Sequence, residues 1–175
     1  MEVSETLTLS KLGFFITFPF PEQSRIDIIK AVKSIDISTK QKEIQDTLDE
    51  KLAKSLKPLG YFSAVEKDTE CNLWLPDFQH AVDFYNPEKK IAIEVEKAEI
   101  KRVTHDLLKL INATKTFRAK IKYGVMIVPD KYFVKSGSKP FISTLKQDIS
   151  FYFGTLLGDA NLFDVLIICY KVTSK

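Results

Sequence analysis

Cysteine is scarce in this sequence, which contains only Cys71 and Cys169 among 175 residues. They form no CxxC pair, and the chain has just two histidines, so neither a zinc site nor a disulfide framework is indicated. A reducing, intracellular compartment fits this usage best, and we expect a cytoplasmic protein.

Long apolar runs are also missing. Stretches such as 165–170 and 13–18 are far shorter than the roughly 20 residues that a membrane-spanning helix needs. The beginning of the chain carries Glu2 and Glu5 where a signal peptide would carry Lys or Arg. We therefore expect no membrane partner and no targeting segment.

Hydrophobic residues make up 45% of the chain, which is enough to bury one core without disulfides or a structural metal. No internal repeat, low-complexity segment or interdomain linker interrupts the sequence. A single domain over residues 1–175 is the expectation.

The net charge of +3 conceals an uneven distribution. Counting Lys and Arg against Asp and Glu gives −3 for residues 1–50, −2 for 51–100, +8 for 101–150 and 0 for 151–175. A segment with eleven basic and three acidic residues is able to hold a polyanion. A solvated basic helix face is an equally good interpretation of the charge alone.

Hydrophobic periodicity predicts alternating helices and strands. Short β segments are expected at 5–9 and 13–18, and a helix opens at Pro21. A second helix is predicted from about 42 to 56, ended by Pro58 and Gly60. Beyond it we expect strands at 75–85 and 90–97, a helix at 103–117, a strand at 123–128, a helix at 141–157 and a strand at 164–170. This order implies an α/β fold with a central mixed β-sheet flanked by helices.

The two strands at 75–97 carry the most informative pattern, because their apolar residues alternate with a period of two. A turn at 86–89 predicts a hairpin that pairs Asp83 with Ala92. In this register the apolar side chains share one face of the sheet, and three carboxylates share the other face: Asp83, Glu94 and Glu96.

Three carboxylates on one sheet face repel one another and lose hydration unless something compensates their charge. A divalent cation would do so, and an all-oxygen ligand set favours Mg²⁺, with Mn²⁺ as a substitute, over zinc. Such an ion polarises a phosphoryl oxygen and lowers the pKa of a bound water. Alternation alone is explained more simply by acids on a solvent-facing strand. Their clustering at one end of the hairpin, close in sequence to the basic segment, favours the metal site.

The spacing of Asp83, ten residues, and then Glu94-Val95-Glu96 resembles the D-x(n)-E-x-K signature of the PD-(D/E)xK nuclease superfamily. The order of elements over about 42–128 matches the core of that superfamily, and the runs 93–96, 102–108 and 123–128 resemble type II restriction endonucleases. The resemblance implies a restriction-endonuclease-like fold. It also implies a Mg²⁺-dependent endonuclease that hydrolyses double-stranded DNA and works as a homodimer on palindromic sites.

By the same resemblance, Asp83 and Glu94 would be catalytic metal ligands. Glu96 stands where the superfamily usually has Lys, which leaves the general base open, although some members carry Glu or Gln there. We take Glu96 as the third catalytic and metal-binding residue. Lys97 follows directly, but strand alternation predicts that it faces the opposite side, so it is only an accessory candidate.

Three further acids are accessory candidates. Asp77 belongs to a literal Pro-Asp pair six positions before Asp83 and is the reserve for the first ligand. Asp49 or Glu50, on the helix at 42–56, would supply the carboxylate that the first helix of the superfamily often adds, although a solvated helix face is the simpler interpretation. We interpret His105 as a surface residue or a DNA contact rather than a base.

Basic residues of the +8 segment are the candidate contacts to DNA phosphates, which position a duplex without specifying its sequence. They are Lys109, Lys115, Arg118, Lys120, Lys122, Lys131, Lys135 and Lys139. Two alternatives stay open: a repair or junction-resolving nuclease that reads DNA shape, and a catalytically inactive DNA-binding module with the same fold, which the Lys-to-Glu departure allows.

Overall fold

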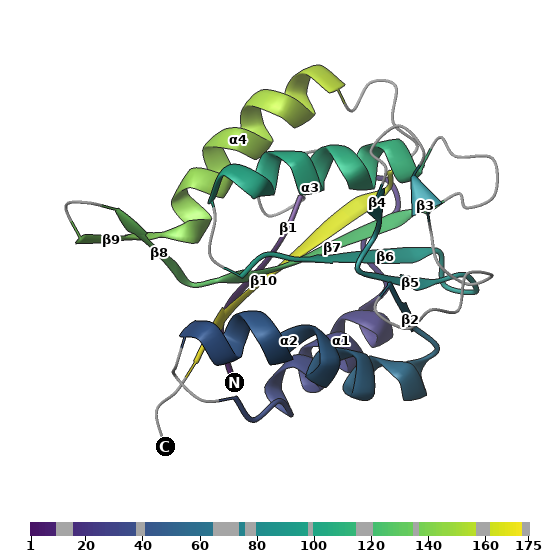
Figure 1. The fold of residues 1–175 in the computed structure, drawn as a ribbon. Coiled ribbons are helices and arrows are strands. Elements are labelled where there is room, and N and C mark those ends of the chain that lie inside the picture. The colour runs from purple at the N-terminus through teal and green to yellow at the C-terminus, as the bar shows by residue number, and fades with distance from the viewer. Residues whose placement is uncertain are drawn as a thin grey trace.

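A six-stranded mixed sheet with the strand order β1-β10-β7-β6-β5-β2 forms the centre of the computed structural model (Figure 1). The structure describes residues 1–9, 16–37, 41–64, 74–75, 80–97, 100–114, 121–134, 137–156 and 162–172. The strands are β1 (Glu2–Thr8), β2 (Phe62–Ser63), β5 (Phe84–Asn86), β6 (Ile91–Val95), β7 (Tyr123–Pro129) and β10 (Asp164–Lys171). β6, β7 and β10 are parallel neighbours, whereas β1, β2 and β5 pair antiparallel.

Helices cover both faces of this sheet. α1 (Glu22–Lys33) and α2 (Gln41–Leu56) lie on one side, and α3 (Ile100–Ala113) and α4 (Phe141–Leu156) lie on the other (Figure 1). Smaller elements are the 3₁₀ turn η2 (Lys57–Leu59) and two separate ribbons, β3 (Trp74–Leu75) with β4 (His80–Ala81) and β8 (Lys131–Val134) with β9 (Gly137–Pro140). The predicted α/β fold with a central mixed sheet flanked by helices is confirmed. Within the described residues, no helix has both the length and the apolarity to cross a membrane.

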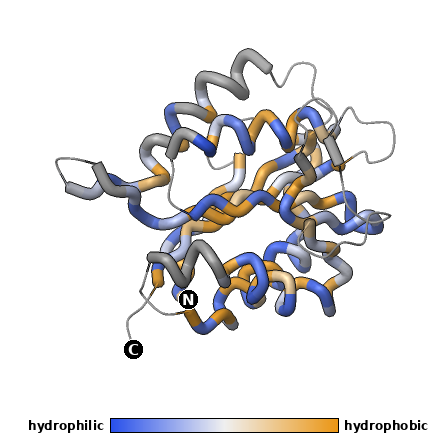
Figure 2. Tube along the Cα trace, viewed as in Figure 1, coloured by the Kyte–Doolittle hydropathy of each residue, from blue (hydrophilic) through white to orange (hydrophobic). Residues whose placement is uncertain are grey.

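The sheet separates two hydrophobic cores. On one face, Ile91 and Ile93 of β6 pack with buried residues of α1 and α2, such as Ile28 and Leu52. On the other face, Ala92 packs with buried residues of α3 and α4. Figure 2 shows the hydrophobic colouring concentrated along these central strands. Burial on both faces is typical of parallel strands enclosed by helices, so β6 is not the half-solvated strand that alternation would allow.

The boundaries of the helices agree closely with the periodicity. In α2, the apolar residues Leu48, Leu52 and Leu56, spaced by four, are fully buried. In α3, the buried apolar residues are Val103, Leu107, Leu110, Ile111 and Ala113, three or four residues apart or adjacent. α3 begins at Ile100, three residues earlier than expected, and residues 115–120, which the prediction partly included, lie outside the described residues. The predicted strand at 13–18 is not formed at 16–18, and 10–15 lie outside the described part.

The predicted hairpin exists, but its register is wrong by two positions. β5 and β6 pair Phe84 with Ile93, Tyr85 with Ala92 and Asn86 with Ile91. The turn occupies 87–90 because the Asn86 side chain accepts the Lys89 N–H at 2.9 Å and Lys90 adopts a left-handed φ of 55°. A shift of two keeps the side chains of these three pairs on their predicted faces, and the next pair in this register would be Asp83 with Glu94.

The predicted strand at 75–85 is interrupted. β3 and β4 pair with each other, apart from the main sheet, and β5 begins only at Phe84. Val82 therefore packs in the core under α3, whereas Phe84 packs in the core under α2, although both were expected on one face. At the interruption, the Asp83 carboxylate accepts the Val95 N–H at 2.7 Å. A side chain thus replaces the strand partner at the end of β6.

Candidate active site

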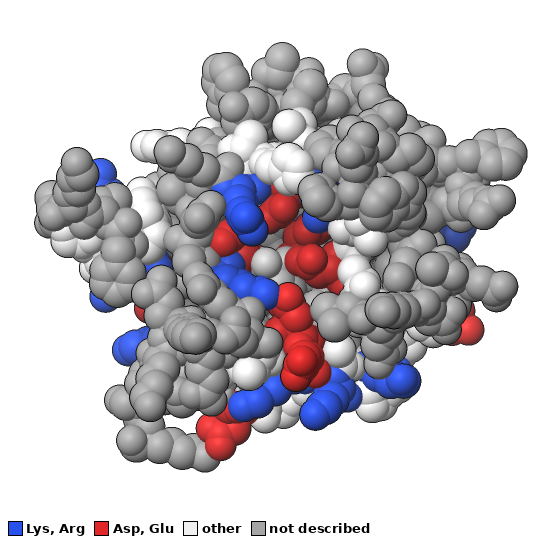
Figure 3. Space-filling view, viewed as in Figure 1, with Lys and Arg blue, Asp and Glu red and all other residues white. Residues whose placement is uncertain are grey.

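A cavity of about 740 Å³ opens where β6 ends, between α3 and α2. Its charged lining comes from four places in the sequence: Asp49 on α2, Asp83 before β5, Glu94 to Lys97 at the end of β6, and Arg102, His105, Asp106 and Lys109 on α3. Figure 3 shows this hollow in the middle of one face, with acidic side chains inside it and basic side chains around them. The three carboxylates predicted from the hairpin therefore line a single cavity.

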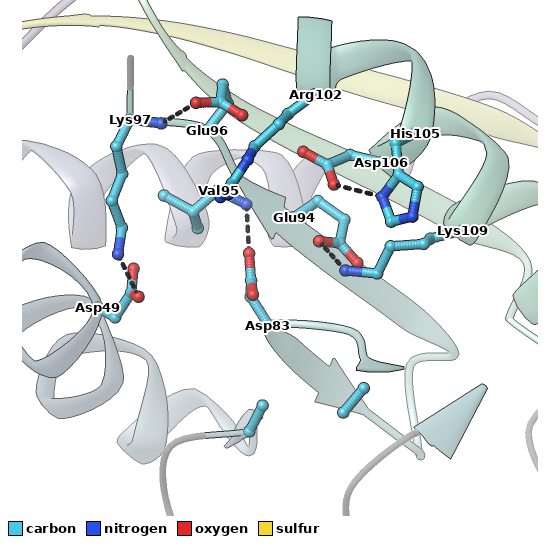
Figure 4. A pocket seen from close by; sticks show the side chains of 12 residues that line it. Asp49, Asp83, Glu94, Val95, Glu96, Lys97, Arg102, His105, Asp106 and Lys109 are labelled. Carbon is cyan, nitrogen blue, oxygen red and sulfur yellow. Dashed lines mark hydrogen bonds and ion pairs between the residues drawn. The ribbon is translucent and has the colours of Figure 1, made fainter. Parts of the chain in front are cut away.

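Glu94 is the most deeply buried of these acids, with 1% of its surface exposed. Its Oε2 accepts a hydrogen bond from the Lys109 ammonium at 2.7 Å, while its Oε1 is buried with no hydrogen-bond partner (Figure 4). Burial raises the pKa of Glu94 well above its ordinary value, and the charges of Asp83 and Asp106 raise it further, against the opposing effect of Lys109. Glu94 thus has one oxygen without a hydrogen-bond partner, and its ionised form is destabilised by its surroundings.

Asp83 lies beside Glu94 and is held by the backbone of the neighbouring strand. Burial raises the pKa of Asp83, and the Asp49 carboxylate adds to this effect. Lys109, the Val95 N–H and Lys97 act in the opposite direction. Because Asp83 also raises the pKa of Glu94, the two acids disfavour each other's ionised form.

Glu96 lines the same cavity as Asp83 and Glu94. It is 5% exposed, and its Oε1 accepts the N–H of Lys97 at 2.8 Å. Its backbone is fixed by the Ile127 carbonyl at 2.9 Å and by the Tyr170 hydroxyl at 3.4 Å. Over the described ranges, no group of three or more His, Cys, Asp or Glu side chains is arranged to hold a metal ion. Asp83, Glu94 and Glu96 all line the cavity, and their role as metal ligands stays a prediction.

Lys97 reaches into the cavity and meets Asp49 on α2. The Lys97 ammonium lies 2.5 Å from Asp49 Oδ2, and Asp49 Oδ1 is buried without a partner. The expectation that Lys97 faces away is wrong, because β6 ends at Val95 and strand alternation no longer governs residue 97. Asp49 is not on a fully solvated helix face, whereas its neighbour Glu50 is exposed and does not line the cavity.

One face of α3 contributes Arg102 and Asp106, which were not predicted as site residues, and Lys109, which was predicted only as a DNA contact. Arg102, Asp106 and Lys109 recur every three or four residues, which places them on one side of the helix. Burial raises the pKa of Asp106 to about 7, with Asp83 and Glu96 contributing and Lys109 and Arg102 opposing. His105 Nδ1 lies 3.6 Å from Asp106 Oδ1. The polar spacing opposite the apolar stripe of α3 was the signal that could have identified Asp106.

The predicted DNA contacts fall into three groups. Lys109 is 6% exposed and lines the cavity, where it pairs with Glu94, and its predicted contact with phosphate stays a prediction. Lys122 is exposed at the start of β7, the opposite end of the parallel strands from Glu94, whereas Lys131 and Lys139 are exposed on the β8–β9 ribbon. The remaining candidates lie outside the described residues: Lys115, Arg118, Lys120 and Lys135, together with the reserve ligand Asp77.

The donor set of the cavity fits a hard divalent cation better than a soft one. Its candidate ligands are carboxylate oxygens, which Mg²⁺ and Mn²⁺ prefer. Glu94 Oε1 and Asp49 Oδ1 are buried acceptors without a hydrogen-bond partner, which is costly unless something binds them. Burial, and to a lesser degree neighbouring carboxylates, raise the pKa values of Asp83, Glu94 and Asp106, and a bound cation would favour their ionised forms.

The fold is similar to that of a restriction endonuclease of known structure. A solved structure with a similar fold is the restriction endonuclease BglII in complex with a DNA 16-mer, with a TM-score of 0.62 and 9% sequence identity. The match covers 97% of this chain and 78% of that one. At this identity the likeness shows the fold.

Residues 20–169 match the model of a protein family described as "Putative halobacteria restriction endonuclease", and the chain belongs to this family. No curated protein sequence matches the chain. The family and the fold confirm the predicted resemblance to restriction endonucleases.

Proposed function

We propose that this protein is a Mg²⁺-dependent endonuclease that hydrolyses phosphodiester bonds of double-stranded DNA, and that it serves as a type II restriction enzyme. Membership of a restriction-endonuclease family supports a nuclease. The observation that carries the finer proposal is the side-by-side placement of Asp83 and Glu94 in a cavity that also holds the Lys109 and Lys97 ammonium groups.

Asp83 and Glu94 would hold the cation, with Glu96 as the third carboxylate of the same wall and Asp49 as an accessory. When bound, Mg²⁺ or Mn²⁺ supplies charge stabilisation for the phosphoryl group and a water of lowered pKa. Glu94 has an Oε1 without a hydrogen-bond partner, whereas Oε1 of Glu96 already accepts the Lys97 N–H. This difference makes Glu94 the primary ligand of the pair.

The cations of the cavity would orient the phosphodiester. Lys109 is buried beside Glu94, and Arg102 lies at the exposed end of the same helix face, so both are placed to contact phosphate oxygens. Neutralising charge that develops on the phosphoryl oxygens is the larger part of catalysis in phosphoryl transfer. Because Lys109 is bound to Glu94, its position is fixed before substrate arrives.

Duplex DNA is the proposed substrate. The similar BglII structure was solved with DNA, and this chain carries +8 over residues 101–150. We further propose a homodimer, because a two-fold pair presents one catalytic centre to each strand of a palindrome. Sedimentation equilibrium should then give about twice the 20.0 kDa of the chain, and a monomer at all concentrations with and without DNA would contradict the dimer.

The proposed activity is tested by incubating purified protein, in stoichiometric excess, with sequenced plasmids in Mg²⁺, Mn²⁺ or EDTA. We expect discrete fragments with either metal and intact plasmid in EDTA. Cutting of branched duplexes alone would indicate a junction-resolving nuclease instead. Intact DNA of every kind in both metals, with salt-sensitive binding retained, would indicate an inactive binding module and refute the enzyme.

A further inference from the structure

The β8–β9 ribbon was not expected, because the sequence pattern of residues 131–140 predicts a loop. It is a two-stranded antiparallel ribbon that pairs Lys131 with Pro140 and Val134 with Gly137. Figure 1 shows it projecting from the body of the protein beyond the end of β7. We infer that this ribbon enters the major groove of the duplex whose backbone is bound at the carboxylate cavity, an inference that rests on the proposed function.

The position of the ribbon relative to the cavity supports this role. β6 and β7 are parallel, with Glu94 opposite Met126 and Val95 opposite Ile127, and the Glu96 N–H donates to the Ile127 carbonyl. β7 ends at Pro129, and the ribbon begins two residues later. The ribbon therefore leaves the sheet at the same end as the candidate catalytic carboxylates and from the adjacent strand.

Hydrogen bonds and packing hold the base of the ribbon in place, as is required of an element that contacts DNA bases in a defined position. The Asp130 N–H donates to the Tyr170 carbonyl at 2.7 Å, and the Phe141 N–H donates to the Asp130 carbonyl at 2.9 Å. The Tyr132 ring packs edge-on against Phe141, with centroids 5.6 Å apart, and both rings belong to the core under α4. Elements that are held by packing position contacts more precisely than free loops do.

The exposed part of the ribbon has the shape and the charge for a DNA groove. All four residues of β9 are exposed, as is Lys131 on β8. From Lys131 to Lys146 the chain has four lysines and no acidic residue, in contrast to the carboxylates of the cavity. A two-stranded ribbon is narrow enough for the major groove of B-DNA, which is about 12 Å wide. Small exposed residues at Gly137 and Ser138 allow close approach to base edges or phosphates.

The test compares Lys131→Gln/Lys139→Gln with Lys30→Gln/Lys33→Gln, a matched double change at the end of α1. Binding of the full chain to a labelled duplex is measured in EDTA over a series of salt concentrations, so that cleavage plays no part. Loss of two phosphate contacts should weaken binding roughly tenfold and reduce the slope of log K against log salt by about 2. The α1 variant should keep the wild-type slope.

Entry of the ribbon into the major groove is tested with a duplex whose cytosines carry glucosylated 5-hydroxymethyl groups, because these groups fill the major groove. Wild type should bind this duplex at least about tenfold more weakly than plain DNA, and the ribbon variant should discriminate less. Equal salt slopes for wild type and ribbon variant, or equal wild-type binding to both duplexes, would overturn the inference. A ribbon variant that alters the sedimentation coefficient instead of the slope would identify a protein contact and refute it as well.

The results of these binding tests can be distinguished from the success or failure of the proposed nuclease function. Ribbon-dependent binding in EDTA by a chain that never cleaves DNA would preserve the inference and refute the nuclease. Metal-dependent cleavage by a chain whose DNA binding is unchanged in the ribbon variant would support the nuclease and refute the inference.

Discussion

Glu94 and Asp106 are two acids of the cavity whose ionised forms are disfavoured by burial and by neighbouring carboxylates. Glu94 is nearly inaccessible and shares its environment with Asp83, so its ionised form loses hydration and meets a like charge. Only one of its oxygens is compensated, by Lys109. Strong pKa shifts with specific charge partners, located in a cavity, are typical of functional sites.

The raised pKa of Asp106 makes the free energy of unfolding depend on pH. Its pKa is about 7 in the folded protein against an ordinary value of 3.8, so the folded state keeps a proton that the unfolded state releases. The folded state binds more protons between these values, and stability must fall as the pH rises from about 4 to about 7. At about 1.4 kcal/mol for each pKa unit, the loss is at most about 4 kcal/mol.

Asp106→Asn removes this titration. In EDTA, the free energy of unfolding of the wild type, measured by urea denaturation, should decline relative to that of Asp106→Asn between about pH 4 and about pH 7 and level off above that. Parallel pH curves for the two proteins would show that Asp106 does not have the raised pKa.

At the scale of elements, the cavity depends on how α2 is tied to the end of β6. The Lys97 ammonium and Asp49 Oδ2 form the contact, and the two side chains are 24% and 26% exposed. An ion pair at such a site contributes modestly to stability, because water still screens it. Its larger effect is to bring the Asp49 carboxylate and the Lys97 side chain to the same cavity as Glu94.

Asp49→Asn should therefore impair cleavage more than stability. We expect its DNA cleavage rate to fall by about tenfold or more, with a loss of about 1 kcal/mol or less in the free energy of unfolding. Glu50→Gln, at the exposed neighbouring position, is the matched control and should change neither quantity measurably. Equal cleavage by both variants would exclude Asp49 from the site.

The elements also show what sequence patterns could and could not predict. α2 and α3 were predictable because their apolar positions recur at helical spacing, and those positions are buried. The hairpin register was not predictable, because a turn at 86–89 and a turn at 87–90 differ only in the capping role of Asn86 and the left-handed φ of Lys90. The direction of Lys97 depends on where β6 stops, and the β8–β9 ribbon carries too weak an alternation to separate it from a loop.

The whole molecule brings together residues as far apart in sequence as Asp49 and Lys109. The motif from Asp83 to Glu96 was visible in the sequence because a hairpin makes it local. The contributions of α2 and α3 depend on packing across the two faces of the sheet, so sequence spacing alone could not place Asp106 in the cavity. The same packing predicts that a cation bound in the cavity stabilises the entire fold.

Mg²⁺ or Mn²⁺ should accordingly raise the thermal unfolding temperature of the DNA-free protein. An ion at 100 times its dissociation constant adds about 2.7 kcal/mol, which corresponds to several degrees for a chain of this size. Asp83→Asn should lose the shift, and Glu88→Gln, in the exposed turn of the same hairpin, should retain it. A shift of equal size in both variants would place the cation elsewhere.

The central claim is that the carboxylates at the end of β6 form a metal-dependent nuclease centre, and Glu94→Gln tests it most directly. Plasmid cleavage in Mg²⁺ should fall by about 100-fold or more in this variant, with salt-sensitive duplex binding preserved, while Glu88→Gln cleaves like the wild type. Cleavage by Glu94→Gln at the rate of Glu88→Gln would contradict the account.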